Sequence, residues 1–312
     1  MITPHPITRR EACRRALLFS AALAFPRLLS SQTPVAAEAG ATLHLFCFGD
    51  WGVQGDPNQK SVARALKKYA ENLLLTPDAL FLLGDNFYGP LPGTDSPRWK
   101  KEFEDMYPAS VFPGKCYAVL GNHDYDDQPG GEKIQLAYAQ TPGTRWTLPD
   151  LWYRLDLPQA TFLCTDTHYA KLTKKQIASQ RAWLEEQLAA PRLTPWLFVC
   201  GHHPVMSCGP QHGDSEHLQS WRELFYRRGV NAYLAGHEHD LQHLREEGRP
   251  THWLISGGGG RDLHPVEPGS STRFAEARFG FLHLSINAKE MQATFVGTNA
   301  EPVYTFRQPA PS

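Results

Sequence analysis

The sequence has no excess of charge of either sign. Its 31 lysines and arginines face 32 aspartates and glutamates, so the formal net charge is -1 at pH 7. This balance gives no reason to expect binding to nucleic acid or to an anionic membrane surface. Cysteine is also scarce, at six in 312 residues, and the spacing does not describe a disulfide framework, although one bridge stays open. Cys47, Cys164 and Cys200 lie in apolar runs, where a free thiol behaves as a small buried hydrophobe.

The apolar run near the N-terminus, Ala16–Phe25, is too short for a comfortable membrane span. A basic region with paired Arg9 and Arg10 precedes it, and a small-x-small cleavage site follows at positions 37–39. This order predicts a cleaved export signal over residues 1–39, and the arginine pair favours the twin-arginine route. A plain secretory signal and an uncleaved anchor are the alternatives. We therefore expect a periplasmic or secreted protein with no stable membrane span once the signal is removed.

The chain also lacks internal repeats and long low-complexity linkers, so residues 40–312 are expected to form a single domain. Apolar, β-favouring runs predict strands over Leu43–Phe48, Ala79–Leu83, Cys116–Leu120, Trp152–Leu157, Ala160–Thr165, Trp196–Cys200, Val230–Ala235, His252–Ser256, Gly280–Ile286, Met291–Val296 and Val303–Phe306. Helices are predicted over Asn58–Leu75, Pro97–Met106, Glu132–Ala139, Thr173–Ala190 and Ser215–Arg228. Strands and helices alternate in the first part of the chain, and the later part is mostly strands. This order favours a layered α/β domain with sheet inside and helices outside.

Metal-ligand residue types follow five of the predicted strands, each directly after a glycine. They are Asp50, Asp85 with Tyr88, Asn122 with His123 and Asp124, His202 with His203, and His237 with His239. Side chains at the carboxyl ends of parallel strands converge above the sheet, and glycine allows a sharp turn or close backbone approach. His237 and His239 are two apart, so on an extended segment both point the same way. The five strand ends therefore predict one site.

The predicted ligands are carboxylates, an amide, a phenol and imidazoles. The set contains no thiolate, which argues against structural zinc. Oxygen and nitrogen ligands of these kinds suit iron, manganese or zinc. A shared carboxylate can hold two ions about 3.5–4 Å apart. At this spacing the ions can activate water and bind both the attacking and the leaving oxygen of a phosphoryl transfer. A two-metal hydrolase is therefore the leading interpretation.

Several of these residues have plainer interpretations. Asp85 alone could be a helix N-cap, and Asn122 could be a turn residue in left-handed backbone. We expect Asp124 to orient a histidine rather than to bind metal. The glycine run Ser256–Arg261 could cradle phosphate, but a flexible loop is the favoured interpretation. Other histidines are expected to be surface or internally satisfied groups, namely His203, His217, His243 and His264.

The five motifs, in this order, resemble the metallophosphoesterase superfamily. The tyrosine of Gly-Asp85-Asn-Phe-Tyr88 and the segment Gly-His237-Glu-His239-Asp-Leu-Gln make the chain similar to purple acid phosphatases of the small tartrate-resistant type. The similarity runs from about Leu43 to Val296. It implies an αββα sandwich, with central sheets flanked by helices. It also implies an acid phosphatase, in which hydroxide held at a two-metal centre attacks small phosphate monoesters in line.

The resemblance also implies roles for individual residues. A ferric ion would be held by Asp50, Tyr88 and His239, and a second ion, Fe(II), Zn(II) or Mn(II), by Asn122, His202 and His237. Asp85 would bridge the two ions. His123 would contact the phosphate, and His212 would help to protonate the leaving group. Tyr88 alone separates the purple type from the rest of the superfamily. Its plainer interpretation is a packed aromatic side chain with no role as a ligand.

Two other functions stay open. A manganese or zinc phosphodiesterase or nucleotidase of the same superfamily would usually lack the tyrosine. A non-catalytic phosphate-binding protein of the same fold would be expected to have lost members of the ligand set, which is complete here. The sequence does not specify the physiological substrate, the second metal or the oligomeric state.

Overall fold

The computed structural model, which describes residues 41–311, contains two seven-stranded sheets, in which the eleven predicted strands are joined by three others. The first sheet has the order β14-β13-β12-β1-β2-β3-β4. Its strands are β1 (Leu43–Phe48), β2 (Ala79–Leu83), β3 (Lys115–Val119), β4 (Trp146–Thr147), β12 (Gly280–Ile286), β13 (Glu290–Gly297) and β14 (Pro302–Pro309). The predicted export signal lies outside the described residues and stays a prediction.

The second sheet has the order β11-β9-β10-β8-β7-β6-β5. Its strands are β5 (Tyr153–Asp156), β6 (Ala160–Cys164), β7 (Trp196–Cys200), β8 (Ala232–Ala235), β9 (Leu241–Leu244), β10 (His252–Ser256) and β11 (Thr272–Glu276). Strands β1 to β4 pair in parallel, as do β6, β7, β8 and β10. The carboxyl ends within each parallel group therefore meet at one edge, as the ligand argument requires.

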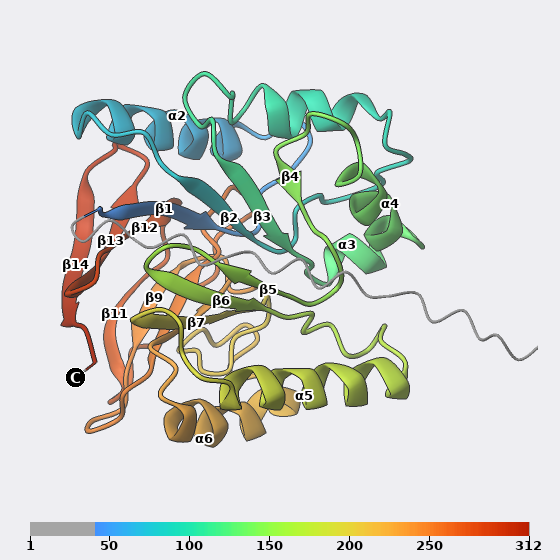
Figure 1. The fold of residues 1–312 in the computed structure, drawn as a ribbon. Helices are drawn as coiled ribbons and strands as arrows, with labels where there is room; N and C mark the ends of the chain where they lie inside the picture. The colour runs from blue at the N-terminus through green and yellow to red at the C-terminus, as the bar shows by residue number, and fades with distance from the viewer. Residues whose placement is uncertain (1–40, 312) are drawn as a thin grey trace, which may run out of the picture. The chain divides into compact units, whose positions relative to one another are not determined.

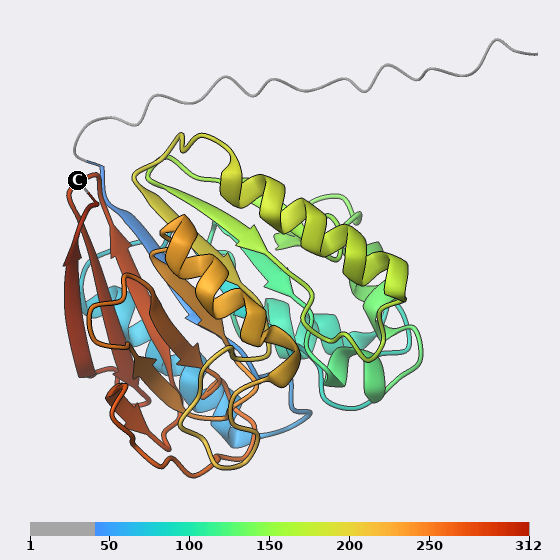
Figure 2. The same ribbon diagram turned by 90° about the horizontal axis from the view of Figure 1, so that it is seen from below.

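Helices cover the outer face of each sheet, with the sheets between them (Figure 1). The first sheet is covered by α2 (Pro57–Asn72) and the π-helix η1 (Trp99–Glu104). The second is covered by α5 (Lys174–Ala189) and by α6 (Gln219–Arg228), which follows the 3-10 turn η2 (Glu216–Leu218) (Figure 2). Two short helices, α3 (His123–Asp126) and α4 (Gly131–Tyr138), follow β3. The predicted αββα layering is confirmed.

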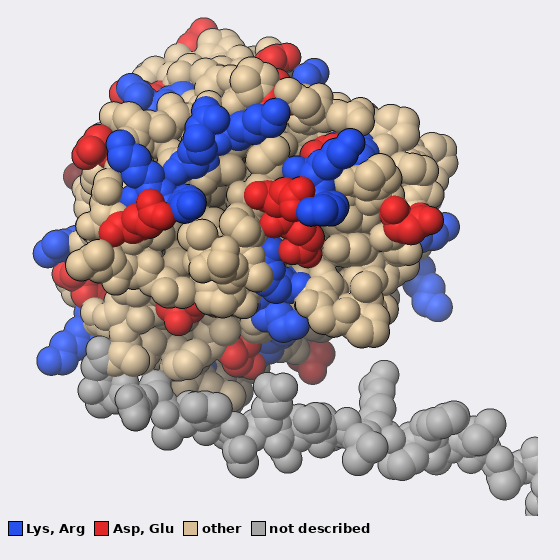
Figure 3. Space-filling view, turned by 90° about the horizontal axis from the view of Figure 1, so that it is seen from above, with Lys and Arg blue, Asp and Glu red and all other residues tan. Residues whose placement is uncertain are grey.

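Helix α2 shows how local sequence fixes these layers. Asp56 caps it by accepting the backbone N–H of Asn58 at 2.5 Å, and Pro57 occupies the first turn, where its missing N–H costs nothing. Its apolar side, including Val62 and Leu66, is buried on the sheet. The opposite side carries four exposed cations, Lys60, Arg64, Lys67 and Lys68. Figure 3 shows lysine and arginine side chains gathered on this face, with acidic groups between them.

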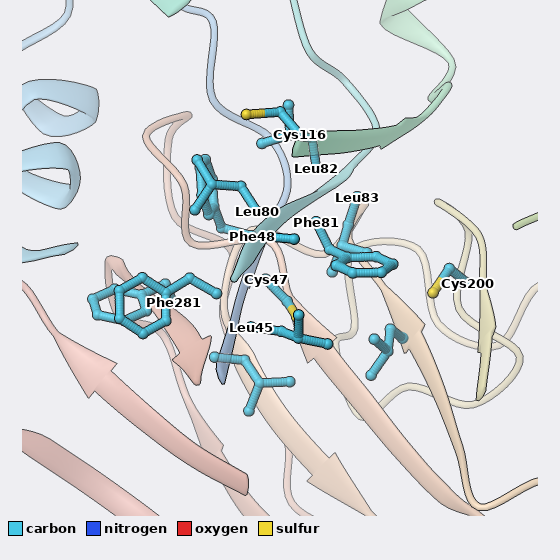
Figure 4. Packing of buried hydrophobic residues seen from close by; sticks show 14 of the residues in the cluster. Leu45, Cys47, Phe48, Leu80, Phe81, Leu82, Leu83, Cys116, Cys200 and Phe281 are labelled. Atoms are coloured by element: carbon cyan, nitrogen blue, oxygen red, sulfur yellow. The ribbon is translucent and has the colours of Figure 1, made fainter. Parts of the chain in front are cut away.

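The core fills the space between the sheets. Phe81 on β2 lies with its ring centroid 4.5 Å from that of Phe162 on β6, so an aromatic pair joins the two sheets. Figure 4 shows the same packing around Leu45, Cys47 and Phe81. All five cysteines in the described part of the chain are free, and four of them are buried. The prediction of buried free thiols is therefore confirmed for Cys47, Cys164 and Cys200, which are part of the apolar core.

Three strands, β4, β9 and β11, were not predicted from the sequence, and the glycine run differs from its prediction. Strand β4 has only two residues, β11 is partly exposed, and β9 buries the polar Gln242 and His243, so none carries an apolar run. The expectation of a flexible loop at Ser256–Arg261 is wrong, because its glycines are buried. A Cβ at Gly257 would lie 2.1 Å from the carbonyl oxygen of Glu238, so the glycines allow close packing of backbone.

No helix within residues 41–311 has the length and apolar character needed to cross a membrane.

A chain of polar side chains, with His243 and His252 buried at its centre, links the two sheets. The Tyr304 hydroxyl lies 3.1 Å from His243 Nδ1, and His243 Nε2 lies 2.8 Å from His252 Nδ1. His252 Nε2 then lies 3.2 Å from Oε1 of Gln308. One set of tautomers satisfies all three bonds, with the hydroxyl and each Nε2–H as donors and both imidazoles neutral.

Replacing His252 with glutamine is expected to weaken the acid sensitivity of folding. Burial lowers the pKa of His252 from 6.5 to about 4, so below pH 6.5 the unfolded chain takes up a proton that the folded chain does not. Stability from this group is therefore complete above pH 6.5 and falls by about 2 kcal/mol between pH 7.5 and pH 5. Urea unfolding of parent and variant at both pH values measures the difference. Equal losses on acidification in the two proteins would contradict the assignment.

Candidate metal centre

The ligand candidates lie in turns directly after β1, β2, β3, β7 and β8. Asp50, Asp85 and His237 have φ angles of 60°, 47° and 70°, in the left-handed region. Such conformations cost about 1–3 kcal/mol each and concentrate at functional sites. The strain therefore falls largely on the ligand residues themselves, and not only on the glycines before them.

The glycines before the ligands have a second role that the sequence did not reveal. A Cβ at Gly121 would lie 2.2 Å from Asp85 Oδ1, and a Cβ at Gly236 would lie 2.5 Å from Asp50 Oδ2. A Cβ at Gly84 would lie 2.6 Å from Nδ1 of His202. Each of these glycines thus leaves room for a ligand that another strand end supplies.

One group of candidate ligands surrounds the hydroxyl of Tyr88. This oxygen lies 3.3 Å from Asp50 Oδ1, 3.3 Å from Asp85 Oδ2 and 3.2 Å from Nε2 of His239. His239 Nε2 also lies 3.5 Å from Asp50 Oδ1. Four potential donor atoms from three strand ends thus converge, and the contacts with Asp50 and His239 are the ones a ligand role for Tyr88 requires.

A second group surrounds His202, which is fully buried. Its Nε2 lies 3.3 Å from Asp85 Oδ2 and 3.3 Å from Nδ1 of His237. Asn122 lies at the start of α3 with φ of -68°, so the left-handed turn interpretation is wrong. Its side-chain oxygen is buried and has no hydrogen-bond partner among the described residues. Asp85 Oδ2 belongs to both groups, which is the position a bridging carboxylate needs.

The charges of this cluster call for a cation. Asp50, Asp85 and His202 are all buried, and one donor atom from each lies within 4.8 Å of the others. Burial opposes the charged imidazolium, yet the neighbouring carboxylates of Asp85 and Asp50 raise the pKa of His202 to about 10. A proton on His202 offsets only part of the carboxylate charge in the protein alone, and a metal cation would meet the remaining electrostatic demand. The orphan Asn122 oxygen and the mixed donor set fit metal ions.

Backbone carbonyls orient two of the imidazoles. His202 Nδ1–H donates to the carbonyl of Leu83 at 2.8 Å, and His239 Nδ1–H donates to that of Asp262 at 2.6 Å. Each bond leaves Nε2 free to face the cluster, the usual arrangement for metal-binding histidines. Sequence reasoning missed Asp262, because a carbonyl acceptor carries no residue signature.

Asp124 is buried but orients no histidine, contrary to expectation. Its carboxylate accepts the backbone N–H groups of Gly121 at 2.8 Å and Asn86 at 2.9 Å, together with the Gln135 amide at 2.7 Å. Burial, and then the charge of Asp85, raise the pKa of Asp124 to about 7. Asp124 therefore holds together the two turns that carry Asp85 and Asn122.

A cavity of about 230 Å³ opens onto the cluster. It is lined by Asp85, Asn122, His123, Gln211, His212, His237, His239, Arg261, Asp262 and His264. Both additional predicted site residues, His123 and His212, are partly exposed in it. His203 lies beside the cluster, where its Nδ1 is 2.9 Å from the Thr167 hydroxyl. Arg261 was not predicted, and its guanidinium lies 5.2 Å from the centroid of the Tyr88 ring.

Comparison with known families agrees with this geometry. Residues 43–241 match the calcineurin-like phosphoesterase family, and human tartrate-resistant acid phosphatase type 5 is 30% identical over 94% of this chain and 97% of its own length. The chain therefore belongs to the calcineurin-like phosphoesterase family. Within that family its relatives are purple acid phosphatases, including purple acid phosphatase 17 of Arabidopsis thaliana, 29% identical over 74% of this chain and 73% of that protein.

Solved structures share the fold. The purple acid phosphatase PPD1 of yellow lupin, Lupinus luteus, superposes with a TM-score of 0.68 at 19% identity, over 88% of this chain and 55% of that one. GAP50, described as the anchor in the inner membrane complex of Plasmodium, gives a TM-score of 0.76 at 23% identity, over 87% of this chain and 90% of that one. At such identities these matches establish the fold and not a shared activity.

Proposed function

We propose that this protein is an acid phosphatase that hydrolyses phosphate monoesters at a dinuclear metal centre. The observation that carries the proposal is the convergence of donor groups from five strand ends around Asp85, with Asp85, Asn122, His237 and His239 lining one cavity. Membership of the phosphoesterase family and similarity to purple acid phosphatases give the same reaction class. When bound, the ions would lower the pKa of water and offset charge on the phosphoryl group.

The contacts support a particular division of the ligands. Asp50, Tyr88 and His239 would hold ferric iron, because a hard ferric ion suits carboxylate and phenolate oxygens. Asn122, His202 and His237 would hold Fe(II), Zn(II) or Mn(II), and Asp85 would bridge the ions. The shared position of Asp85 Oδ2, 3.3 Å from Tyr88 and 3.3 Å from His202, supports the bridge.

Two histidines beside the cluster would act on the substrate. His123 Nδ1 lies 2.9 Å from an Asp127 oxygen, so its Nε2 is available for a phosphate oxygen in the cavity. His212 also lines the cavity, with its ring centroid 4.1 Å from that of His237. His212 would give the proton that the departing alcohol oxygen takes up as the ester bond breaks.

The predicted site of action is the periplasm or the exterior of the cell. The N-terminal basic, apolar and small-residue order supports export, and the paired Arg9 and Arg10 favour the twin-arginine route. That route carries folded proteins, which suits an enzyme loaded with metal before export.

The choice between monoesterase, diesterase and non-catalytic protein can be tested by one pair of substrates. We expect the metal-replete protein to hydrolyse p-nitrophenyl phosphate with a kcat/KM at least about 10²-fold above that for bis(p-nitrophenyl) phosphate, because a diester lacks one terminal oxygen for the site to bind. Faster hydrolysis of the diester would favour the phosphodiesterase alternative. Absence of hydrolysis of both would favour a non-catalytic phosphate-binding protein of the same fold.

A further inference from the structure

A buried carboxylate outside the proposed ligand set lies directly behind the site. Glu238 falls between His237 and His239 in sequence, but its side chain is fully buried and is not part of the cavity lining. Its Oε1 accepts the backbone N–H groups of His212 at 3.0 Å and Gly213 at 2.9 Å. Glu238 therefore fastens the segment that carries His212 to the turn that carries two candidate metal ligands.

The second carboxylate oxygen of Glu238 faces two imidazoles. Its Oε2 lies 3.5 Å from Nδ1 of His212 and 3.2 Å from Nδ1 of His264. Both rings line the cavity. Because the Nδ1 atoms turn toward the buried carboxylate, Nε2 is the nitrogen that each ring has left for a substrate.

Close packing fixes this arrangement. A Cβ at Gly209 would lie 2.5 Å from Cδ of Glu238, so the chain passes directly against the carboxylate. The Cys208 carbonyl accepts the N–H of Glu267 at 2.8 Å, which ties the same loop to the segment of His264. The His264 ring stacks on that of His239 with centroids 3.8 Å apart. His264 is therefore a fixed wall of the cavity.

We infer that Glu238 is a positioning residue that holds His212 and His264 as a pair along the path of the departing alcohol. This inference rests on the proposed phosphatase function. It adds the residues that allow the enzyme to hydrolyse esters with poor leaving groups. As the bond from water oxygen to phosphorus forms, that water gives up one proton to solvent, the phosphorus–ester oxygen bond breaks, and the ester oxygen keeps the electron pair. His212 Nε2 delivers the proton that converts it to the alcohol, and solvent later restores the proton. His264 Nε2 is a second hydrogen-bonding atom beside the same oxygen.

The test compares two substrates that differ in their need for that proton. Glycerol 2-phosphate releases a strongly basic alkoxide unless a proton is delivered, whereas p-nitrophenolate leaves readily as an anion. Glu238→Gln is expected to lower kcat about 10–100-fold on glycerol 2-phosphate and less than about threefold on p-nitrophenyl phosphate. His264→Gln, which leaves the backbone bonds of Glu238 in place, is expected to change kcat in the same direction.

Asp240→Asn is the matched control, because Asp240 is a buried acid two residues away that does not line the cavity. Its Oδ2 accepts Nε2–H of Gln242 at 2.8 Å, and burial raises the pKa of Asp240 to about 8, so asparagine preserves its neutral state in acid. This control should show no substrate-dependent loss. Equal losses on both substrates in Glu238→Gln, or no loss, would overturn the inference, as would a lower metal content than the parent's. Inactivity of the metal-replete parent would instead refute the proposed function.

Discussion

Replacing Asp85 with alanine is expected to lower the activity on p-nitrophenyl phosphate by at least about 10³-fold, because several kcal/mol of transition-state stabilisation depend on both ions. Asp85 Oδ2 lies 3.3 Å from both the Tyr88 hydroxyl and Nε2 of His202, whereas Asp50 Oδ1 is 4.0 Å from that same nitrogen. The other oxygen of Asp85 accepts the N–H of His123 at 2.8 Å, so the substitution also frees that turn. Metal analysis of the purified variant should show loss of both ions.

Asp240→Asn again serves as the control and should keep its metal and its activity. The comparison separates loss of a bridge from loss of any buried acid in this part of the fold. An Asp85→Ala variant that hydrolyses aryl phosphates as fast as the parent would show that the two-metal interpretation is wrong. Loss of activity with full metal content would show that Asp85 acts on the substrate and does not bridge the ions.

Tyr88→Phe is expected to abolish the visible absorption band of the iron-loaded protein. In the proposed assignment the Tyr88 phenolate is a ferric ligand, and charge transfer from phenolate to iron gives the colour. Asp50, His239 and Asp85 surround the same position, so the variant should keep most of its iron. The loss in kcat should be less than about tenfold, because the group is a ligand and takes no part in proton transfer.

Tyr125→Phe is the matched control for colour. Tyr125 is also buried near the site, but its hydroxyl donates to Asp166 and contacts none of the candidate ligands. Its removal should leave the band unchanged. A band that survives in Tyr88→Phe would assign the colour to another group. A colourless iron-loaded parent would remove the ferric–phenolate assignment while leaving hydrolysis open.

The central strands could be predicted almost to the residue because they are buried on both faces. β1, β2 and β7 are continuous apolar runs that stop at the glycine before a ligand, so both their length and their ends are marked. β9 could not be predicted in this way. Its buried Gln242 and His243 are stabilised by partners distant in sequence, namely Cys208 and Tyr304, which a local pattern cannot reveal.

The same contrast applies to the site. Side chains that follow strands could be grouped from topology alone, since parallel strand ends meet at one edge. The residues that position them were missed, because their roles depend on contacts between loops. Glu238 was given no role although it stands between two candidate ligands, and Asp124 was expected to orient an imidazole although it accepts backbone N–H groups. Gly121 and Gly236 show the same limit, since the space they leave is filled by ligands from other motifs.

The most direct test of the central claim is the metal content of the purified, exported protein, measured together with protein concentration. A dinuclear centre predicts about two metal ions per chain, with iron as at least one of them. Full activity with one ion per chain, or with none, would contradict the account.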